Sequence, residues 1–333
     1  MIALKRFLAF VLLLALFLTG CRAQAPEQVE FFSMDTLMSV KLWGDPDGKA
    51  AREVVQTINA LASALSVTDA QSEIARLNET GSAALSEETA ALLAAALELS
   101  RRTDGAFDPT VYPLVRLWGF TQEVQAVPDA AALQAALSSV GTQNVLLHGS
   151  NVALLHGAML DFGGIAKGYA AEKCAKLLEA AGIETALLSL GGNMQTVGVK
   201  PDESAWVVGI ADPEAPAEPI ALLTFTGSLA LVTSGGYQRY FEQDGKRYHH
   251  ILDPSTGYPV QNDLASATVL TESGTLADAL STALFVMGLE RALEFWRASD
   301  DFEAVFITHD RMIYATEGAA PLLSGCEFEV IRR

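Results

Sequence analysis

The sequence predicts an α+β fold: a largely antiparallel sheet core flanked by helices, in a single large domain. Helical apolar spacing dominates the first half of the chain, whereas short strands separated by turn residues follow one another after residue 185. These runs do not alternate as strand–helix–strand units, the pattern that builds parallel sheets. No linker, repeat or low-complexity tract divides the 333 residues, so we expect one domain rather than two.

The first residues indicate an export leader that is not part of this fold. Two basic residues precede an apolar run over 7–18, which is too short to span a bilayer and fits the core of a signal peptide. Small residues then lead to Cys21, as at the processing site of bacterial lipoproteins, where the cysteine becomes the lipidated first residue. An ordinary signal peptide cut nearby is the alternative. The expected divisions are a lipoprotein signal peptide over 1–20, a lipid-anchored tether over 21–30 and the folded domain over 31–333.

The charge balance excludes some partners. Acidic residues outnumber basic ones by 40 to 22, and the net charge is −18. Such a charge disfavours binding to nucleic acid or to an anionic membrane surface. The membrane anchor must therefore be the lipid on Cys21 and not a basic patch. We expect the protein to be anchored on the outer, extracytoplasmic face of the cell membrane.

Helices are predicted where apolar residues recur at helical spacing. Ser86 is an N-cap followed by two acidic residues, which favour the positive end of a helix. Pro128-Asp129 opens a short helix, and Gly182 ends a longer one. The expected helices cover 50–65, 87–102, 128–139, 166–181, the segment around Asp278, and 290–298.

Strands are predicted from short runs of apolar and β-branched residues bounded by turn residues. Asp244-Gly245 is a strong hairpin pattern, and Gly149-Ser150 indicates a second hairpin. The expected strands cover 38–43, 144–148, 152–155, 186–190, 194–199, 206–211, 220–226, 229–232, 237–242, 246–251, 266–270, 304–308 and 312–315.

The segment Tyr248–Pro259 (YHHILDPSTGYP) carries the most informative pattern. Its prolines and glycine restrict the backbone, so the segment is expected to be a rigid turn that presents imidazole and carboxylate groups, as catalytic loops do. Further along, Asp278 and Thr282 lie four residues apart on one face of an apolar helix. An aspartate is rarely buried there without a partner. A cation is the natural partner for two such oxygen ligands.

Glycine-rich segments form the remaining clusters. Asp161–Tyr169 (DFGGIAKGY) is a turn that opens a helix, with Lys167 in its first turn. Backbone N–H groups at such a helix start bind anions, so this segment suits a phosphate group, although it lacks the Walker spacing. Ser189–Asn193 and Thr233–Tyr237 are further Gly-Gly turns. Each cluster alone is ambiguous, since a Gly-Gly turn is more often structural than a ligand site.

Taken in order, these motifs resemble the ApbE family of FAD:protein FMN transferases, from about residue 34 to 288. The matching stretches are Ser72–Asn78, Thr103–Trp118 (TDGAFDPTVYPLVRLW), Asp161–Tyr169, Leu190–Asn193, Thr233–Tyr237, Tyr248–Pro259 and Ala277–Leu284 (ADALSTAL). The resemblance implies an ApbE-like, T-fold-like domain. It also implies a reaction in which a Ser or Thr hydroxyl of an acceptor flavoprotein attacks the FMN-side phosphorus of FAD. FMN becomes attached through a phosphoester bond and AMP leaves, with Mg²⁺ on the pyrophosphate.

The resemblance implies roles for individual residues as well. His250 is the expected base, and Asp253 orients it or shapes the turn. Asp278, Thr282 and the carbonyl group of Gly164 are the expected Mg²⁺ ligands. The expected contacts to FAD are Met34, Thr68, Ala106, Phe107, Asp108, Asp161, Lys167 and Leu252.

Two departures from the family pattern concern the flavin site. The usual Met-Gly-Thr is Met34-Asp35-Thr36 here, and Thr68 stands where an aromatic residue is common. The alternative functions are those of an exported lipoprotein that only binds FAD, or of a pyrophosphatase that converts FAD to FMN and AMP. The acceptor would be a flavoprotein such as a subunit of a membrane redox complex.

Overall fold

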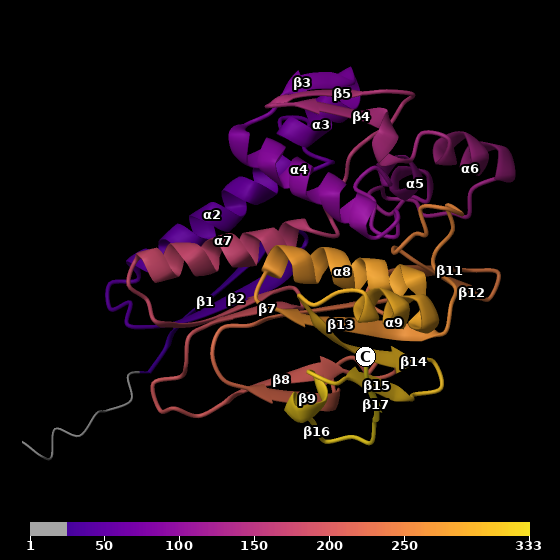
Figure 1. The fold of residues 1–333 in the computed structure, drawn as a ribbon. Coiled ribbons are helices and arrows are strands. Elements are labelled where there is room, and N and C mark those ends of the chain that lie inside the picture. The colour runs from indigo at the N-terminus through magenta and orange to yellow at the C-terminus, as the bar shows by residue number, and fades with distance from the viewer. Residues whose placement is uncertain (1–24) are drawn as a thin grey trace, which may run out of the picture.

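A nine-stranded sheet forms the centre of the molecule in the computed structural model, which describes residues 25–333 (Figure 1). The strand order is β1-β2-β6-β7-β10-β13-β14-β15-β17, and only the last pair is parallel. This confirms the predicted α+β class with a largely antiparallel sheet. The strands are β1 (Glu27–Ser33), β2 (Thr36–Trp43), β6 (Thr185–Leu190), β7 (Asn193–Val197), β10 (Ala230–Gly235), β13 (Leu264–Thr271), β14 (Glu303–Thr308), β15 (Ile313–Thr316) and β17 (Glu329–Ile331).

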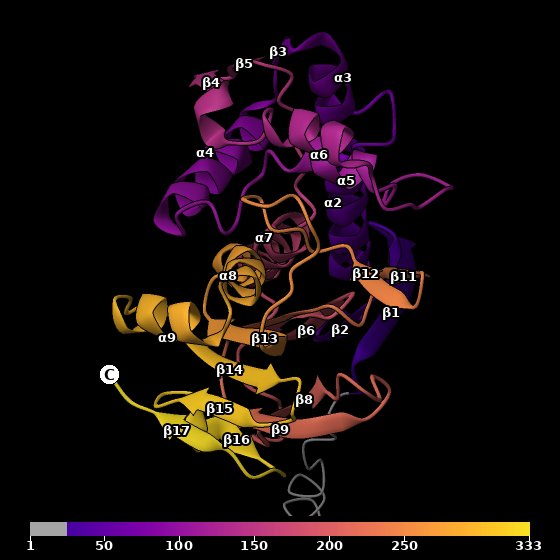
Figure 2. The same ribbon diagram turned by 90° about the vertical axis from the view of Figure 1, so that its right-hand side faces the viewer.

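Helices cover one face of this sheet. Those nearest to it are α2 (Lys49–Leu65), α7 (Ala166–Ala180), α8 (Gly274–Met287) and α9 (Leu289–Arg297). A second layer lies above them and holds α3 (Glu73–Thr80), α4 (Glu87–Arg102), α5 (Tyr112–Leu117), α6 (Ala130–Leu137), the 3₁₀ turn η1 (Thr142–Asn144), and a small sheet of β3 (Ser82–Ala84), β5 (Asn151–Leu154) and β4 (Val145–His148). Figure 2 shows these layers from the side.

The opposite face of the large sheet packs against a second small sheet. Its strands are β8 (Trp206–Ala211), β9 (Pro219–Phe225) and β16 (Leu323–Ser324), which follows the 3₁₀ turn η2 (Ala320–Leu322). The buried side chains of Trp206, Leu223 and Phe225 belong to the same apolar cluster as Leu231 and Val305 of the large sheet. The central strands β13 and β14 are therefore buried on both faces.

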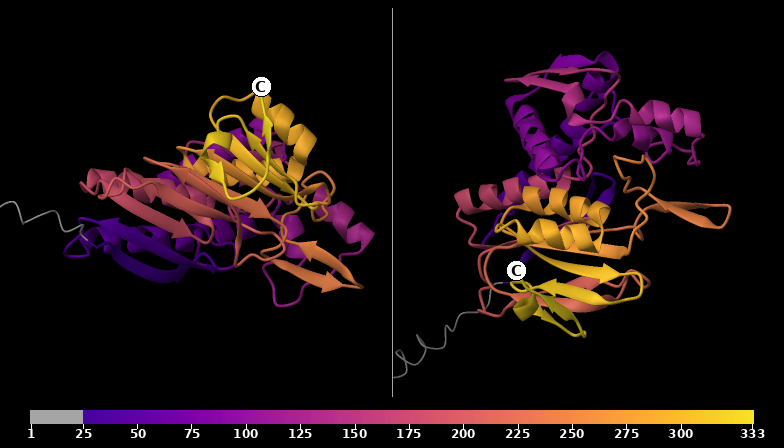
Figure 3. Two further views of the ribbon diagram at one scale, coloured as in Figure 1. Left: turned by 90° about the horizontal axis from the view of Figure 1, so that it is seen from below. Right: turned by 45° about the vertical axis from the view of Figure 1, so that its right-hand side comes forward.

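Two strands stand apart from all of these layers. They are β11 (Tyr240–Gln243) and β12 (Lys246–His249), which pair with each other around the expected Asp244-Gly245 turn. In the right-hand view of Figure 3 this hairpin projects from the side of the molecule. Aromatic side chains attach this hairpin to the rest of the molecule. The rings of Phe241 and Tyr248 stack with their centres 5.4 Å apart, and the Tyr248 ring lies 5.4 Å, centre to centre, from that of Trp118.

The predicted helix starts are confirmed at atomic detail. Ser86 Oγ accepts a hydrogen bond from the backbone N–H of Thr89 at 3.2 Å, and the carboxylate of Asp129 accepts one from Ala132 at 2.9 Å. Each bond satisfies an amide that the helix itself leaves free.

The structure corrects the boundary of the tether. Residues 27–30, expected in a polar tether, belong to β1 and pair with β2 along its length. The reason is the alternation of side chains: Val29 and Phe31 pack against the core while the residues between them face outward. The helices α3 and α5 were also not predicted, because eight and six residues are too few to show a helical period and neither begins with a Pro-Asp pair such as the one before α6.

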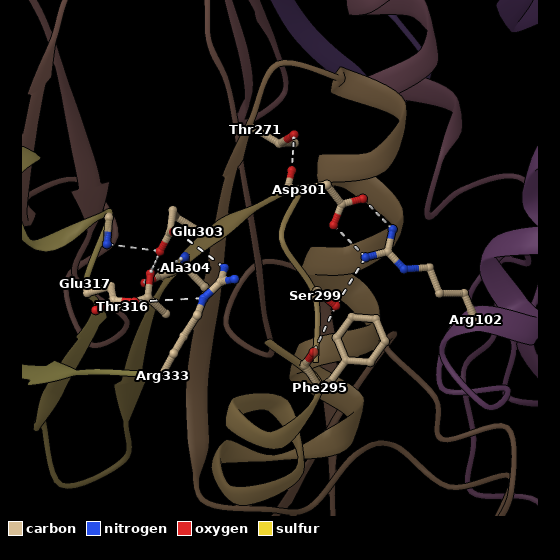
Figure 4. A network of polar contacts seen from close by, with 11 residues as sticks. Arg102, Thr271, Phe295, Ser299, Asp301, Glu303, Ala304, Thr316, Glu317 and Arg333 are labelled. Atoms are coloured by element: carbon tan, nitrogen blue, oxygen red, sulfur yellow. Dashed lines mark hydrogen bonds and ion pairs between the residues drawn. The ribbon is translucent and has the colours of Figure 1, made fainter. Parts of the chain in front are cut away.

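A polar network joins the helical layers to the C-terminal part of the chain (Figure 4). The Arg102 guanidinium donates two hydrogen bonds of 2.6 Å to the Asp301 carboxylate and one of 3.2 Å to Ser299 Oγ. It also lies 5.5 Å from the centre of the Phe295 ring. The pair fixes the end of α4 against the segment between α9 and β14.

None of the helices within residues 25–333 is both long enough and apolar enough to cross a membrane. The leader and Cys21 lie outside the described residues.

Candidate active site

A cavity of about 1170 Å³ opens between the helical layers and one end of the large sheet. Its walls come from the β1–β2 turn, the segments after α2 and α4, the start of α7, the β10–β11 connection, the His250 segment and α8. All but two of the expected site residues line it: Met34, Thr68, Ala106, Phe107, Asp108, Asp161, Gly164, Lys167, His250, Leu252, Asp278 and Thr282. The two are Asp253, which is discussed below, and Cys21, which lies outside the described residues.

The three expected metal ligands meet where α7 crosses α8. Asp278 is 3% exposed, and its Oδ2 accepts a hydrogen bond of 2.8 Å from the backbone N–H of Gly168. A Cβ atom on Gly164 would lie 3.4 Å from Thr282 Oγ1, which places this backbone beside the hydroxyl. Ser234 Oγ lies 3.3 Å from the same hydroxyl. The arrangement gathers one carboxylate, one hydroxyl and one backbone segment at the cavity wall.

The glycine-rich turn before α7 and the first turn of that helix bring a carboxylate and a lysine close together. Asp161 Oδ1 accepts a hydrogen bond of 2.6 Å from the backbone N–H of Gly163. Lys167 Nζ donates to the Gly163 carbonyl at 3.3 Å. Burial raises the pKa of Asp161, against the opposing effect of the Gly163 N–H and of the nearby cations Lys167 and Arg239. The turn thus presents a cation to the cavity next to a carboxylate.

Asp108 lies within the Thr103–Trp118 motif. Its Oδ1 accepts hydrogen bonds from the N–H and the Oγ1 of Thr110, at 2.7 and 2.6 Å. Burial is the main influence and raises the pKa of Asp108. These bonds fix the carboxyl group beside Ala106 and Phe107 at the cavity wall.

The two adjacent histidines face different cavities, as the extended strand requires. His250 lines the large cavity, whereas His249 lines a separate one of about 660 Å³ and donates a hydrogen bond of 2.9 Å from Nε2 to the Val260 carbonyl oxygen. A carbonyl oxygen only accepts, so Nε2 of His249 carries its proton in this contact. Burial lowers the pKa of His250 to about 4, with the Arg239 cation as the next cause. His250 is therefore neutral near pH 7 and able to accept a proton.

Asp253 shapes the turn and does not contact His250 through a hydrogen bond in the described structure. Its Oδ1 accepts from the N–H and the Oγ of Ser255, at 2.8 and 2.7 Å. Its backbone carbonyl accepts from Gly257 at 2.8 Å. Of the two roles expected for Asp253, these contacts support the structural one, and the expectation that it orients the imidazole finds no support.

Comparison with known proteins agrees with this geometry. The sequence pattern of the ApbE family matches residues 34–306. The chain belongs to the ApbE family. It is 37% identical over 287 residues to the FAD:protein FMN transferase of Klebsiella pneumoniae, covering 84% of this chain and 88% of that protein. It is also 37% identical over 288 residues to that of Treponema pallidum, covering 81% and 80%. The crystal structure of the ApbE protein of Thermotoga maritima superposes with a TM-score of 0.84 at 32% identity, covering 89% of this chain and 99% of that one.

The first departure from the ApbE pattern lies in the tight turn between β1 and β2. Met34 and Asp35 are its two central residues, with φ of 47° and 58°. Two positive φ values define the hairpin turn that usually takes glycine or asparagine. Aspartate tolerates this conformation better than most side chains. Asp35 therefore keeps the turn while adding a carboxylate to the cavity wall.

The second departure, Thr68, also lies at the cavity. Its backbone N–H donates to Ser66 Oγ at 3.2 Å, and the two hydroxyls are 3.3 Å apart. The loop after α2 is thus ordered by its own hydroxyl groups, without the aromatic ring that is common in the family.

Several cavity residues escaped the sequence analysis. They include Phe32, Asn193, Ser234, Gln238 and Arg239. Asn193 and Ser234 lie inside recognised glycine motifs, so the motifs were found but the roles of these polar members were not. Arg239 follows the Thr233–Tyr237 motif by two residues and lacks any pattern of its own. The expected hairpin around Asp244-Gly245 places it opposite His250, but nothing in the sequence indicates that its side chain faces the cavity.

Proposed function

We propose that the protein transfers the FMN moiety of FAD to a Ser or Thr hydroxyl of an acceptor flavoprotein, with release of AMP. The observation that carries the proposal is a single cavity that contains a neutral imidazole, a buried carboxylate with a hydroxyl beside it, and a lysine at a helix start. Phosphoryl transfer depends mainly on positioning and charge neutralisation, and these groups supply both.

The protein residues divide the work between the two substrates. His250 takes the proton of the attacking hydroxyl, since it is neutral near pH 7 and faces the cavity. Lys167 and the N–H groups at the start of α7 attract the pyrophosphate. The buried side chains of Ala106, Phe107 and Leu252 give the flavin and adenosine an apolar wall.

Mg²⁺ is part of the proposal. Asp278 is buried, takes part in no ion pair among the described residues, and has only one of its oxygens engaged by an N–H group. No group of three or more His, Cys, Asp or Glu side chains that could hold a metal occurs within 25–333. Mg²⁺ does not require one, because it keeps several waters and shares substrate phosphates. Asp278, Thr282 and the Gly164 carbonyl would hold the ion, which would neutralise charge on the pyrophosphate.

Hydrolysis of FAD to FMN and AMP is the competing activity, because water can take the place of the acceptor hydroxyl. The test incubates the protein with FAD, Mg²⁺ and a candidate acceptor, and follows AMP release together with flavin fluorescence of the acceptor on a denaturing gel. We expect AMP release to depend on the acceptor and to equal the flavin attached. AMP release without acceptor labelling would identify a pyrophosphatase. FAD binding without AMP release would identify a simple binding protein.

We also propose that the domain is held on the outer face of the cell membrane by lipid on Cys21. The leader pattern supports this, and strand β1 starts only six residues later, so the domain would sit close to the surface. Cys21→Ser should release an active protein from the membrane fraction. A variant that stays in that fraction and still carries lipid would contradict the proposal.

A further inference from the structure

The Arg239 side chain is a cation at the cavity wall that has no carboxylate partner within ion-pair distance in the described structure. Its guanidinium makes one long hydrogen bond, 3.5 Å, to the carbonyl of Phe120. The residue is exposed and lines the cavity. It is close enough to Asp161 and to His250 to influence the pKa of both. A guanidinium in this position has free donors that point to an anionic ligand.

The backbone of Arg239 contacts the expected base directly. Its carbonyl oxygen accepts the backbone N–H of His250 at 3.1 Å and lies 3.2 Å from His250 Nδ1. Because a carbonyl oxygen cannot donate, Nδ1 carries the imidazole proton in this contact. The lone pair of the neutral ring is then on Nε2. Arg239 therefore fixes the tautomer of the base through its carbonyl group and places a cation beside it through its side chain.

We propose that Arg239 is a catalytic residue, whose guanidinium binds the phosphoryl group under transfer while its carbonyl holds His250 in the tautomer that accepts a proton at Nε2. This rests on the proposed FMN transfer. The acceptor oxygen forms a bond to the FMN-side phosphorus as the bond from that phosphorus to the bridging oxygen breaks. AMP leaves with the bridging oxygen, and the hydroxyl proton moves to Nε2 and then to water. No oxidation or reduction occurs.

Arg239 complements Lys167 in this arrangement. Lys167 belongs to the start of α7, beside the Gly164 backbone and the Asp278 helix. Arg239 belongs to the β10–β11 connection, and its backbone lies opposite the base in the segment after β12. The fork of an arginine can bind two oxygens of one phosphate, which a lysine cannot. The geometry therefore assigns the attacked phosphate to Arg239 and leaves the rest of the pyrophosphate to α7.

The base is also sensitive to this cation. The charged groups that act on His250 are Arg239, His249 and Lys167, and all three favour its neutral form. Removal of the Arg239 charge therefore raises the pKa of His250. The acid limb of the transfer rate should move to higher pH in Arg239→Ala and less in Arg239→Lys.

The test compares Arg239→Ala and Arg239→Lys with Arg247→Ala. Arg247 is a matched control on the same hairpin, since it stacks 4.0 Å from the centre of the Tyr240 ring and pairs with Glu242 outside the large cavity. We expect Arg239→Ala to lower the single-turnover transfer rate by about 10²–10³, while FAD affinity, read by fluorescence quenching, falls much less. Arg239→Lys should retain intermediate activity, and Arg247→Ala should match the wild type. Free guanidinium ion should restore part of the rate of Arg239→Ala but none of that of His250→Ala.

Three results would overturn the inference. They are a wild-type rate in Arg239→Ala, a loss of FAD affinity as large as the loss of rate, or a rate that guanidinium ion leaves unchanged. If Arg239→Ala melts far below the wild type, Arg239→Lys decides instead, and a wild-type rate and pH profile there would overturn the inference. A wild-type protein that binds FAD but attaches no FMN would contradict the proposed function itself. The two failures are distinguishable, because the role of Arg239 is tested by the ratio of variant to wild-type rate, which requires an active wild type.

Discussion

Gly168→Ala should damage the site through the helix crossing that builds it, because the added methyl group would press on Gly274 and on the backbone side of Asp278, while every ligand side chain is kept. A Cβ atom on Gly168 would lie 2.1 Å from the Gly274 carbonyl oxygen and 2.6 Å from Asp278 Cβ. The reciprocal atom on Gly274 would lie 2.5 Å from the Gly168 carbonyl oxygen. Both helices present backbone at this contact, so no flexible side chain can move aside. The helices must separate by roughly 1 Å to reach ordinary contact distance.

The size of the effect follows from this separation. Overpacking in a well-packed region costs about 1–3 kcal/mol, and a contact between two backbones belongs at the upper end. The better helix propensity of alanine offsets about 1 kcal/mol of it. In a domain of about 300 residues, the net loss of about 2 kcal/mol lowers the melting temperature by roughly 3 °C. Movement of Asp278 and Thr282 away from Gly164 should cost about 10² in rate, as misplacement by 1 Å does elsewhere.

Thermal melting and transfer assays on Gly168→Ala would measure both effects. Glu179→Ala, on the exposed face of the same helix, is the matched control and should behave like the wild type. We expect the loss of rate in Gly168→Ala to persist at temperatures where the variant is fully folded. A variant with wild-type melting temperature and wild-type rate would refute the argument that this close crossing positions the site.

Three further predictions concern single groups. Asp278→Asn keeps an acceptor for the backbone N–H that the carboxylate binds but removes its charge, so Mg²⁺-dependent transfer should be lost while the melting temperature changes little. His250→Ala should lower transfer by about 10²–10⁴, the usual contribution of a general base, with much less effect from His249→Ala. Burial tends to raise the pKa of Glu172, but hydrogen bonds from Lys176, Ser273 and Thr275 outweigh it and lower the pKa to about 2. Glu172 therefore stabilises the fold above its unfolded pKa near 4.5, and this contribution disappears as the pH falls toward 2.

Each of these predictions has a result that contradicts it. For Asp278→Asn it is wild-type transfer at ordinary Mg²⁺ concentrations. For the histidine pair it is a larger loss in His249→Ala, or an equal loss of FAD binding in both variants, which would make the segment a cofactor clamp. For Glu172 the measurement is the difference in melting temperature between wild type and Glu172→Gln. This difference should shrink as the pH falls from 5 to about 3, and a constant difference would show that the carboxylate does not contribute through its charge.

The sequence was most informative where a local rule acts. The N-caps Ser86 and Asp129, the Asp244-Gly245 hairpin and the Asp278–Thr282 spacing all depend on neighbours along the chain. Strand β1 was missed because its apolar residues alternate with charged ones, a pattern that a polar tether also allows. Its pairing with β2 decides the matter, and pairing is a tertiary property.

The site residues likewise divide into those that local motifs indicate and those that only the tertiary structure reveals. His250, Lys167 and Asp108 were found because they lie in dense polar motifs. Arg239 was not, because an isolated arginine on a strand connection is typical of any protein surface. Its backbone contact to His250 continues the register of the β11–β12 hairpin, whereas its contact to Phe120 exists only once the hairpin folds back on the segment after α5. The role of Asp253 could not be decided from sequence either, since a carboxylate three residues from an imidazole can face it or bond its own turn.

Intact mass of an acceptor flavoprotein tests the central claim most directly. The acceptor is incubated with FAD and Mg²⁺, with and without this protein, and in parallel with its target Ser or Thr replaced by Ala. We expect the acceptor with its native Ser or Thr to gain the mass of FMN less one water, whereas the Ala variant of the acceptor gains none. With His250→Ala in place of the wild-type enzyme, we expect no gain over the same time. An acceptor whose mass stays unchanged while the protein binds FAD and releases AMP would contradict the central claim.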